Sequence, residues 1–136
     1  MKIGFDFTKG EIITDNNYSK PFDENECEIL EQIIKMLSNN FESTNFKIVK
    51  NCKDYTTLQY KMIDIVRIKY TDRAKWITIS MADNDCAREN INNPLFNNEK
   101  NKNKAHWKSS LKDSNNISVY LPFLIKSCKQ IDEFNN

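Results

Sequence analysis

The sequence predicts an α+β domain in which an antiparallel sheet of four or five strands carries two long helices packed on one face. Three observations lead to this prediction: helical periodicity over residues 24–38 and 115–132, alternating β-forming segments between them, and no internal repeat. A chain of 136 residues has the usual length of one domain. We therefore expect a single α+β domain over residues 21–136, with residues 1–20 as a peripheral hairpin and linker.

The first helix is expected from about Glu24 to Ser38. Asp23 is a suitable N-cap, and Glu26 follows three residues later, as in a capping box. The expected buried stripe repeats at helical spacing and consists of Ile29, Leu30, Ile33, Ile34 and Leu37. This pattern is typical of an amphipathic helix that lies on a sheet.

The middle of the chain predicts an antiparallel meander, with strands at 46–50, 55–60, 62–70 and 75–81 and a short strand at 105–109. A tight turn at Thr71 and Asp72 would pair Arg67 with Trp76. Because directly paired residues share a face, one face of this hairpin carries Val66, Ile68, Ile77 and Ile79, capped by Lys75. The other face carries Ile65, Arg67, Lys69, Trp76 and Thr78. A slip of one residue would exchange the two faces.

Both ends of the chain and one internal segment add smaller elements. Residues 5–14 alternate and turn at Lys9-Gly10, which predicts a small hairpin that covers an edge of the main sheet. Residues 83–90 are a candidate short helix, and Leu95 and Phe96 are expected to anchor the polar loop 97–104. The last helix is expected to begin near Ser114, with Pro122 either kinking it or beginning its second segment.

Composition and cysteine use exclude several classes of site. Gly4 and Gly10 are the only glycines, so a Gly-rich phosphate loop is excluded. The four cysteines are widely separated and are expected to be free thiols: Cys27, Cys52, Cys86 and Cys128. A single histidine, His106, does not complete a zinc site with them. We therefore expect no cofactor and no bound metal.

The distribution of apolar residues predicts a cytoplasmic protein with no membrane contact. No apolar run approaches the roughly 20 residues that cross a bilayer. Residues 1–6 lack the apolar stretch of a secretory signal. The oligomeric state stays open, because an exposed strand edge beside the meander would allow dimerisation.

Positive charge is concentrated in the middle of the chain, where residues 61–112 carry eleven Lys/Arg and six Asp/Glu although the net charge is +1. The hairpin places Arg67, Lys69 and Trp76 on one face. A guanidinium beside an indole on an open sheet can stack on a base or hold a phosphate. The structural alternative is that Trp76 lies under a helix and Arg67 covers it or pairs with an acid.

A second candidate binding segment lies between residues 100 and 108. Lysines that alternate with asparagine, followed by an indole, resemble a loop that contacts phosphates. Such tracts also arise without function. The two segments are expected to converge on the sheet face opposite the helices, with His106 as a polar surface group and Trp107 as a second stacking surface. The candidate residues of this segment are Lys100, Lys102, Lys104, His106, Trp107 and Lys108.

Three stretches of the chain carry a family resemblance: Asp64–Ile77, Asn93-Pro94-Leu95-Phe96 and Lys100–Ser109. They resemble a family of small uncharacterised proteins from low-GC Gram-positive bacteria, their phages and mobile elements. The resemblance covers about residues 22–133. It implies no reaction, because the family has no established activity. Glu99 stands where similar sequences often have glutamine, which places an acid inside the basic loop.

Three functions from different classes follow. The leading hypothesis is a non-enzymatic binding module whose partner is nucleic acid or an anionic protein surface. The second is a phage or mobile-element protein that acts through protein contacts, such as an inhibitor of a host defence system. The third is a magnesium-dependent nuclease built from Asp64, Lys75, Asp83 and Asp85, although their spacing departs from the compact Asp…Glu-x-Lys pattern of such enzymes.

Overall fold

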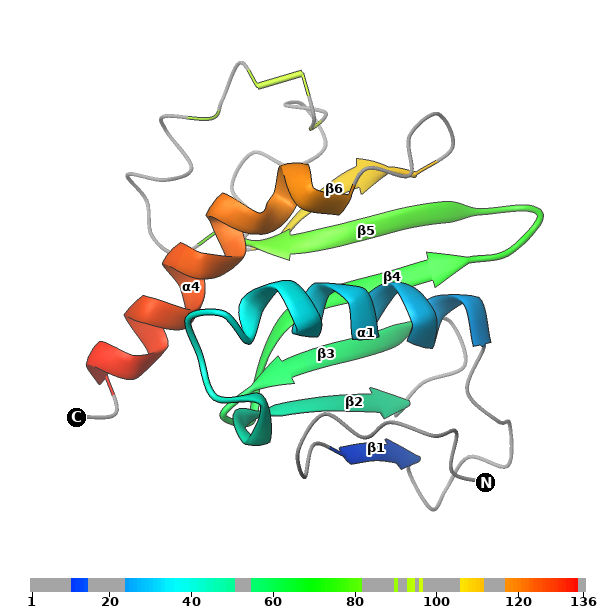
Figure 1. The fold of residues 1–136 in the computed structure, drawn as a ribbon. Coiled ribbons are helices and arrows are strands. Elements are labelled where there is room, and N and C mark those ends of the chain that lie inside the picture. Colours follow the sequence, from blue (N-terminus) through cyan, green and yellow to red (C-terminus); the bar gives the residue numbers. More distant parts are fainter. Residues whose placement is uncertain are drawn as a thin grey trace.

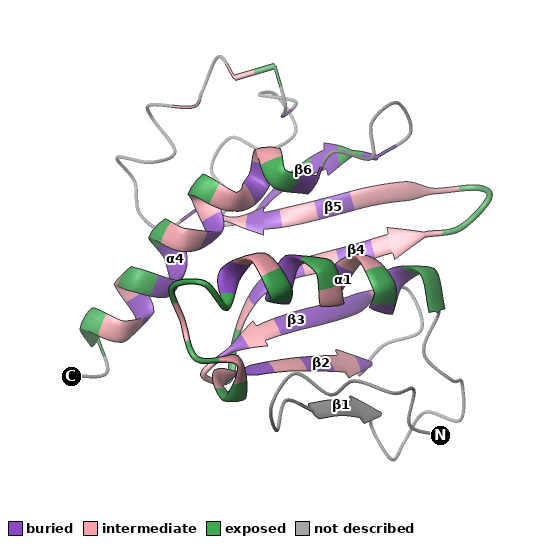
Figure 2. Ribbon diagram, in the orientation of Figure 1, coloured by how far each residue is buried: buried purple, intermediate pink, exposed green. Residues whose placement is uncertain are grey.

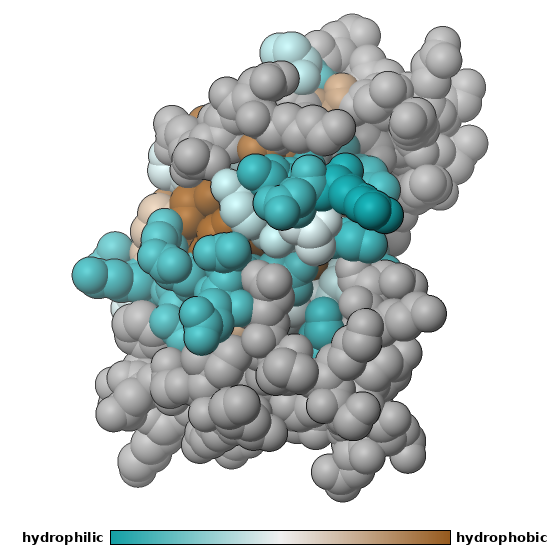
Figure 3. All heavy atoms as spheres, turned by 90° about the vertical axis from the view of Figure 1, so that its right-hand side faces the viewer, coloured by the Kyte–Doolittle hydropathy of each residue, from teal (hydrophilic) through white to brown (hydrophobic). Residues whose placement is uncertain are grey.

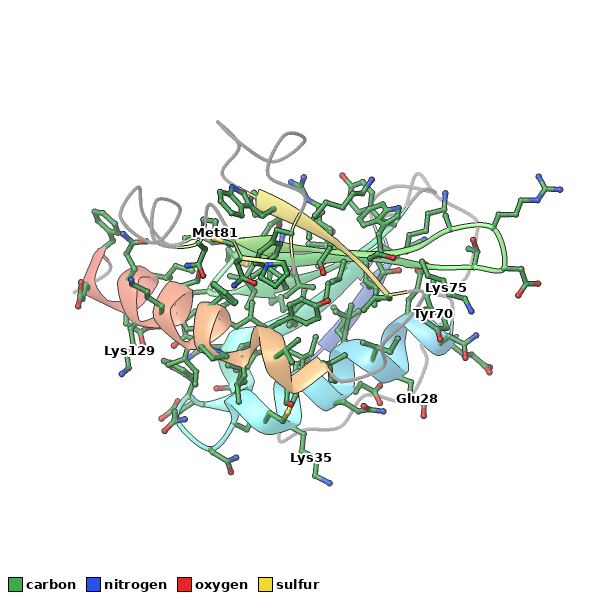
Figure 4. All side chains as sticks on the ribbon, turned by 90° about the horizontal axis from the view of Figure 1, so that it is seen from above. Glu28, Lys35, Tyr70, Lys75, Met81 and Lys129 are labelled. Carbon is green, nitrogen blue, oxygen red and sulfur yellow. The ribbon has the colours of Figure 1, made fainter. Side chains whose placement is uncertain are left out.

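The structure, a computed structural model, describes residues 24–50, 55–81, 90, 93–94, 96, 106–111 and 117–134, together with the backbone of residues 11–14. In these residues the chain forms one six-stranded sheet with two α-helices on the same face (Figures 1 and 4). The elements are β1 (Glu11–Thr14), α1 (Glu24–Leu37), η1 (Ser43–Asn45), β2 (Phe46–Lys50), β3 (Thr56–Tyr60), β4 (Ile63–Tyr70), β5 (Lys75–Ser80), β6 (His106–Ser110), η2 (Ile117–Tyr120) and α4 (Leu121–Phe134).

The strands lie in sequence order from β1 to β6, and β2 to β6 pair antiparallel with their neighbours. The predicted α+β class and antiparallel sheet of four or five strands are confirmed, with five antiparallel strands observed. β1 adds a sixth strand that runs parallel to β2, with Ile12 opposite Ile48. Part of the segment predicted as peripheral thus belongs to the edge of the main sheet. The predicted first arm of the N-terminal hairpin, the linker 15–20 and the N-cap Asp23 lie outside the described residues.

The core lies between the sheet and the helices (Figure 2). The residues of the stripe predicted on α1 are buried, except that Ile29 is half-buried. On the sheet, alternate residues point under the helices, as the period of two in a strand requires. The fully buried side chains of this sheet face include Phe46, Ile48, Leu58, Ile68 and Ile77.

A buried carboxylate ties the start of α1 to the sheet. Glu26 accepts a hydrogen bond from the hydroxyl of Thr56 at 2.6 Å and another from the backbone N–H of Tyr70 at 2.9 Å. The ammonium of Lys50, also buried, lies 3.7 Å from Glu26 Oε1. Because buried charges are costly unless paired and hydrogen-bonded, this arrangement holds α1 in one position over β2, β3 and β4.

The C-terminal helix begins where the sequence permits it. The turn η2 precedes α4, and Pro122 is the second residue of α4, where its missing N–H costs no helical hydrogen bond. Ser127 then donates a hydrogen bond to the carbonyl of Ser80 at 3.0 Å. The second of the two predicted outcomes for Pro122, a new helical segment, is therefore the observed one.

The β3–β4 turn is held to the end of α4. Lys61 and Met62 have φ of 49° and 73°, the left-handed region that residues other than glycine seldom adopt. The Lys61 ammonium pairs with Asp132 at 2.6 Å, and the hydroxyl of Tyr60 donates to the same carboxylate at 2.8 Å. These contacts compensate for the unfavourable backbone conformation of the turn.

The predicted register of the β4–β5 hairpin is wrong by two residues. Tyr70 pairs with Lys75, and Trp76 pairs with Lys69 rather than Arg67. The loop therefore spans residues 71–74, closed by the N–H of Thr71, which donates to the Ala74 carbonyl at 2.9 Å. Since the error is an even number of residues, each side chain of β5 stays on its predicted face.

Trp107 is a second correction. Its side chain is only 2% exposed and lies on the helix-covered face, where it packs edge-on against Phe96 with ring centroids 5.5 Å apart. Phe96 also packs against Phe123 at 5.4 Å and is buried in the core, whereas the loop that it was predicted to anchor lies outside the described residues. The candidate helix 83–90, apart from Asn90, and the residues Leu95 and 97–104 lie outside the described residues.

No helix in the described part of the chain is long and apolar enough to cross a membrane. Cys27 and Cys128 are buried free thiols, as predicted, and Cys52 and Cys86 lie outside the described residues. Burial raises the pKa of the Cys128 thiol to about 12, with a further contribution from the charge of Asp132.

Candidate functional site

The sheet face opposite α1 and α4, which we call the open face, carries polar, cationic and aromatic side chains in three rows across the strands. Strand register defines the rows: Arg67 pairs with both Thr57 and Thr78, and Thr78 pairs with Lys108. The aromatic row contains Tyr55, Lys69, Trp76 and Ser110, the arginine row contains Thr57, Arg67, Thr78 and Lys108, and the acid row contains Gln59, Asp64, Ser80 and His106.

The aromatic row joins two rings with a cation. The ring centroids of Tyr55 and Trp76 lie 6.2 Å apart with an interplanar angle of 55°. The ammonium of Lys108 lies 4.5 Å from the Trp76 centroid, within the range of a cation–π interaction. Trp76 is half-buried among these neighbours, and α1 and α4 both lie on the other face. The alternative in which one of these helices covers Trp76 is therefore wrong.

Arg67 lies at the centre of the open face, and its guanidinium contacts groups in the other two rows. Its Nη2 donates to Asp64 Oδ2 at 3.2 Å, and its Cζ lies 5.4 Å from the Tyr55 centroid. The second oxygen of Asp64 accepts a hydrogen bond from the Gln59 amide at 2.9 Å. The side chain of Arg67 is 36% exposed. Arg67 thus pairs with an acid, as the structural alternative anticipated, while part of the cation stays accessible to solvent.

A β-bulge puts Asp64 beside Arg67. Two residues three apart in a regular strand point to opposite faces. Leu58 of β3 pairs with Val66 of β4, but the next residue, Gln59, pairs with Asp64 and skips Ile65. Ile65 is the extra residue, and it is fully buried in the core. The prediction that Ile65 lies on the open face is therefore wrong, because the bulge brings Asp64 there instead.

Four buried polar atoms in the described residues have no hydrogen-bond partner, and all four belong to open-face side chains. They are Thr57 Oγ1, Arg67 Nε, Thr78 Oγ1 and His106 Nδ1. Three of these side chains are direct neighbours in the arginine row. Buried polar groups are nearly always hydrogen-bonded, and each exception costs about 1–3 kcal/mol. Their concentration on one face distinguishes this surface from the rest of the described structure.

His106 reports the electrostatics of the same surface. Burial lowers the pKa of the imidazole below its ordinary value of 6.5, and the positive charge of Arg67 lowers it further, partly offset by Asp64. The neutral ring is therefore favoured in the folded protein. The pKa of a group that is both desolvated and beside a cation changes strongly when an anion binds nearby.

The structure brings together five of the predicted binding residues, namely Arg67, Lys69, Trp76, His106 and Lys108. Trp107 is excluded because its ring lies in the core on the opposite face. Lys100, Lys102 and Lys104 lie outside the described residues. Sequence reasoning missed Tyr55, Thr57 and Gln59, and it considered Asp64 only as part of the nuclease hypothesis. The alternation of residues 55–59 indicated that Tyr55, Thr57 and Gln59 share one face. Nothing in the alternation indicates the bulge that brings Asp64 to this face.

The nuclease arrangement is not formed by Asp64 and Lys75. Asp64 lies on the open face, whereas Lys75 pairs with Tyr70 on the helix-covered face, its ammonium 4.7 Å from the Tyr70 ring centroid. Asp83 and Asp85 lie outside the described residues. Within the residues that are described, no three His, Cys, Asp or Glu side chains form a group that could hold a metal ion.

A cavity of about 250 Å³ lies on the helix-covered side, where α1 approaches the end of β4. An apolar area between two hydrophilic ones is visible at this end of the molecule (Figure 3). The cavity shares no lining residue with the open face. Its lining residues are Asn25, Glu28, Ile29, Gln32, Tyr70, Leu111 and Ile117.

Comparison with known proteins gives no match to a protein-family model, a curated protein or a solved structure.

Proposed function

We propose that this chain is a non-enzymatic binding module for single-stranded nucleic acid, and that the open face is its binding surface. The observation that supports this most directly is the position of Trp76 between Tyr55 and the Lys108 ammonium, next to the row that contains Arg67. Aromatic rings on an open sheet accept bases by stacking, and cations beside them hold the backbone phosphates. An anionic protein surface would use the cations but not the paired rings.

The dimensions of the sheet match this chemistry. The aromatic and arginine rows are two residues apart along each strand, or about 6.7 Å at the usual rise per residue. A base on Trp76 and Tyr55 would therefore place its phosphate near Arg67, Lys69 or Lys108. Three such cations predict a salt dependence with a log–log slope of about −2, at about 0.7 per phosphate contact on a single strand.

The test is a titration of labelled single-stranded and duplex oligonucleotides, followed by fluorescence anisotropy at about 50 and about 200 mM salt. Trp76→Leu is expected to weaken single-strand binding by about 1–3 kcal/mol, the usual contribution of one stacked base. Lys108→Ala is expected to reduce the salt slope by about 0.7. Lys35→Ala and Lys129→Ala are matched controls, because both lysines are exposed and point away from the sheet (Figure 4).

Absence of binding even at the lower salt concentration would refute the proposal. Equal losses in the open-face variants and in the controls would show that the attraction is not localised on the open face. Tryptophan fluorescence gives a second readout, since a base stacked on Trp76 quenches it while Trp107 is buried on the other face.

The β3–β4 turn supports a second candidate, in which the chain acts through contacts with another protein. Met62, Ile63 and Phe134 are the exposed large hydrophobic residues of the described structure, at 68%, 46% and 82%. Each lies within two residues of a partner in the Lys61–Asp132 ion pair. Pull-down with wild type and with Met62→Ser/Ile63→Ser tests this candidate. A partner that resists nuclease treatment and is lost only in the variant would support it, and equal recovery by both proteins would exclude the turn.

A further inference from the structure

We infer that the arginine row of the open face is a phosphate subsite, and that Asp64 occupies the place of the phosphate in the free protein. This inference rests on the proposed function and deepens it, because it names the group of the ligand that the row would bind. The ligand chemistry is a phosphate mono- or diester, held by one edge of the Arg67 guanidinium and the hydroxyl of Thr57 or Thr78.

Asp64 contacts only one of the two donors on an edge of the Arg67 guanidinium. Nε and Nη2 share one edge of a guanidinium, and carboxylates and phosphates commonly accept from both at once. Here Asp64 accepts only from Nη2, at 3.2 Å, while Nε has no partner. Asp64 is also held by Gln59, at 2.9 Å on its other oxygen. Asp64 therefore occupies one of the two donors on this edge, and its hydrogen bond with Gln59 restrains it from also accepting from Nε.

The hydroxyls on either side extend the same set of donors. Thr57 and Thr78 are the direct cross-strand partners of Arg67, and neither Oγ1 has a hydrogen-bond partner. Directly opposite residues in antiparallel strands have Cβ atoms about 4.5–5.5 Å apart. The two threonines flank Arg67, so their Cβ atoms are about 9–11 Å apart, and a tetrahedral oxyanion on the Arg67 edge would reach the hydroxyl on one side. One ligand group would then satisfy two of the four unpartnered atoms, Arg67 Nε and one threonine Oγ1.

Binding requires the guanidinium to exchange Asp64 for the phosphate. The unpartnered atoms are buried in the free protein, so the side chains above them must move apart when the ligand enters. The Arg67–Asp64 pair is about one-third exposed and its atoms are 3.2 Å apart, so the exchange breaks a weak interaction. The carboxylate then selects against weak anions, because only a ligand that also reaches a threonine hydroxyl replaces it completely.

The test uses inorganic phosphate and a nucleoside monophosphate, with the unphosphorylated nucleoside as control, in NMR titrations that follow the Thr57, Arg67 and Thr78 amides and the His106 ring. Phosphate is expected to shift these signals, and the nucleoside alone is not. Arg67→Lys keeps the charge and loses the two-donor edge, so we expect about a tenfold loss in phosphate affinity. Arg73→Lys, in the exposed hairpin loop, is the matched control.

Two further variants separate this subsite from general electrostatics. Asp64→Asn keeps the acceptor for Gln59 and removes the competing charge, so phosphate affinity is expected to rise about three- to tenfold. Thr57→Val and Thr78→Val each remove an unpartnered hydroxyl. The variant that lacks the hydroxyl in contact with the phosphate should weaken phosphate binding, and both should leave the thermal midpoint unchanged or higher. Weaker binding in Asp64→Asn, unchanged affinity in both valine variants, or phosphate shifts spread over other surfaces would each overturn the inference.

The outcomes also distinguish the subsite from the proposed function. Oligonucleotide binding that depends on Trp76 but not on Arg67→Lys or the valine variants would retain the binding module and remove the phosphate subsite. Phosphate binding at Arg67 without any oligonucleotide binding would retain the subsite and exclude single-stranded nucleic acid as the ligand.

Discussion

Removing the Glu26 carboxylate is expected to destabilise the fold more than any single change on the open face. In Glu26→Ala the Lys50 ammonium loses its buried counter-charge, and the hydroxyl of Thr56 and the N–H of Tyr70 lose the acceptors that now lie 2.6 and 2.9 Å away. Breaking a buried pair from one side costs about 3–5 kcal/mol, because the remaining charge stays buried. Such a loss is a large fraction of the total stability of a typical domain, about 5–15 kcal/mol.

Urea unfolding, followed by circular dichroism, measures the effect. With a slope of about 2 kcal/mol per molar, the midpoint should fall by about 1.5–2.5 M. Lys50→Met alone should cost much less, since Glu26 keeps the hydrogen bonds from Thr56 and Tyr70. The double variant Glu26→Ala/Lys50→Met is then expected to be more stable than Glu26→Ala alone, because no unpaired charge remains.

Two results would refute this reasoning. A loss below about 1 kcal/mol for Glu26→Ala would mean that water or another group solvates the Lys50 ammonium as well as the carboxylate does. Additive losses in the double variant would mean that the two charges are not coupled across their 3.7 Å separation. Either result would show that the Glu26–Lys50 pair does not hold α1 in its position over the sheet.

Three further predictions concern burial and titration. Because the pKa of His106 lies below its ordinary 6.5 in the folded protein, the unfolded chain binds the proton more readily. The contribution of the neutral His106 ring to stability is therefore complete above about pH 6.5 and is lost as the pH falls through the folded-state pKa. The free energy of unfolding should differ between pH 7.5 and pH 5.5, and His106→Asn should remove this difference. Trp107→Ala should lower the free energy of unfolding by about 3–5 kcal/mol in urea titrations, and a surface-like loss below about 0.5 kcal/mol would contradict its place in the core. The Cys128 thiol, with its pKa raised to about 12, should react with a thiol reagent only after urea unfolds the chain, and fast native labelling mapped to Cys128 by mass spectrometry would argue against its burial.

Alternation was sufficient to predict which face most hairpin residues occupy, even though their pairing was wrong. Arg67 and Trp76 are not partners, yet they share the open face because the register error is two residues and side chains alternate with a period of two. The same local reasoning placed α1 correctly, since its apolar stripe repeats at 3.6 residues along a single helix.

The candidate site was predicted less completely, because part of it depends on which strands become neighbours. Tyr55 and Thr57 join the surface only through the pairing of β3 with β4. Trp107 was assigned to the open face because it follows a lysine-rich segment, whereas the pairing of β6 with β5 turns its ring toward Phe96. An indole beside lysines in the sequence is not necessarily beside them in a strand, since successive side chains point to opposite faces.

The sequence by itself determined the class of the fold, the two helices and the alternation that separates Arg67 and Trp76 from the core, because periodicity is a local property of the chain. Only the tertiary structure decided what Arg67 meets. The bulge at Ile65 brings Asp64 onto its face, and strand pairing places Thr57 and Thr78 on either side of it. Both depend on contacts between segments distant in the chain, where side chains select the register that buries the most apolar surface.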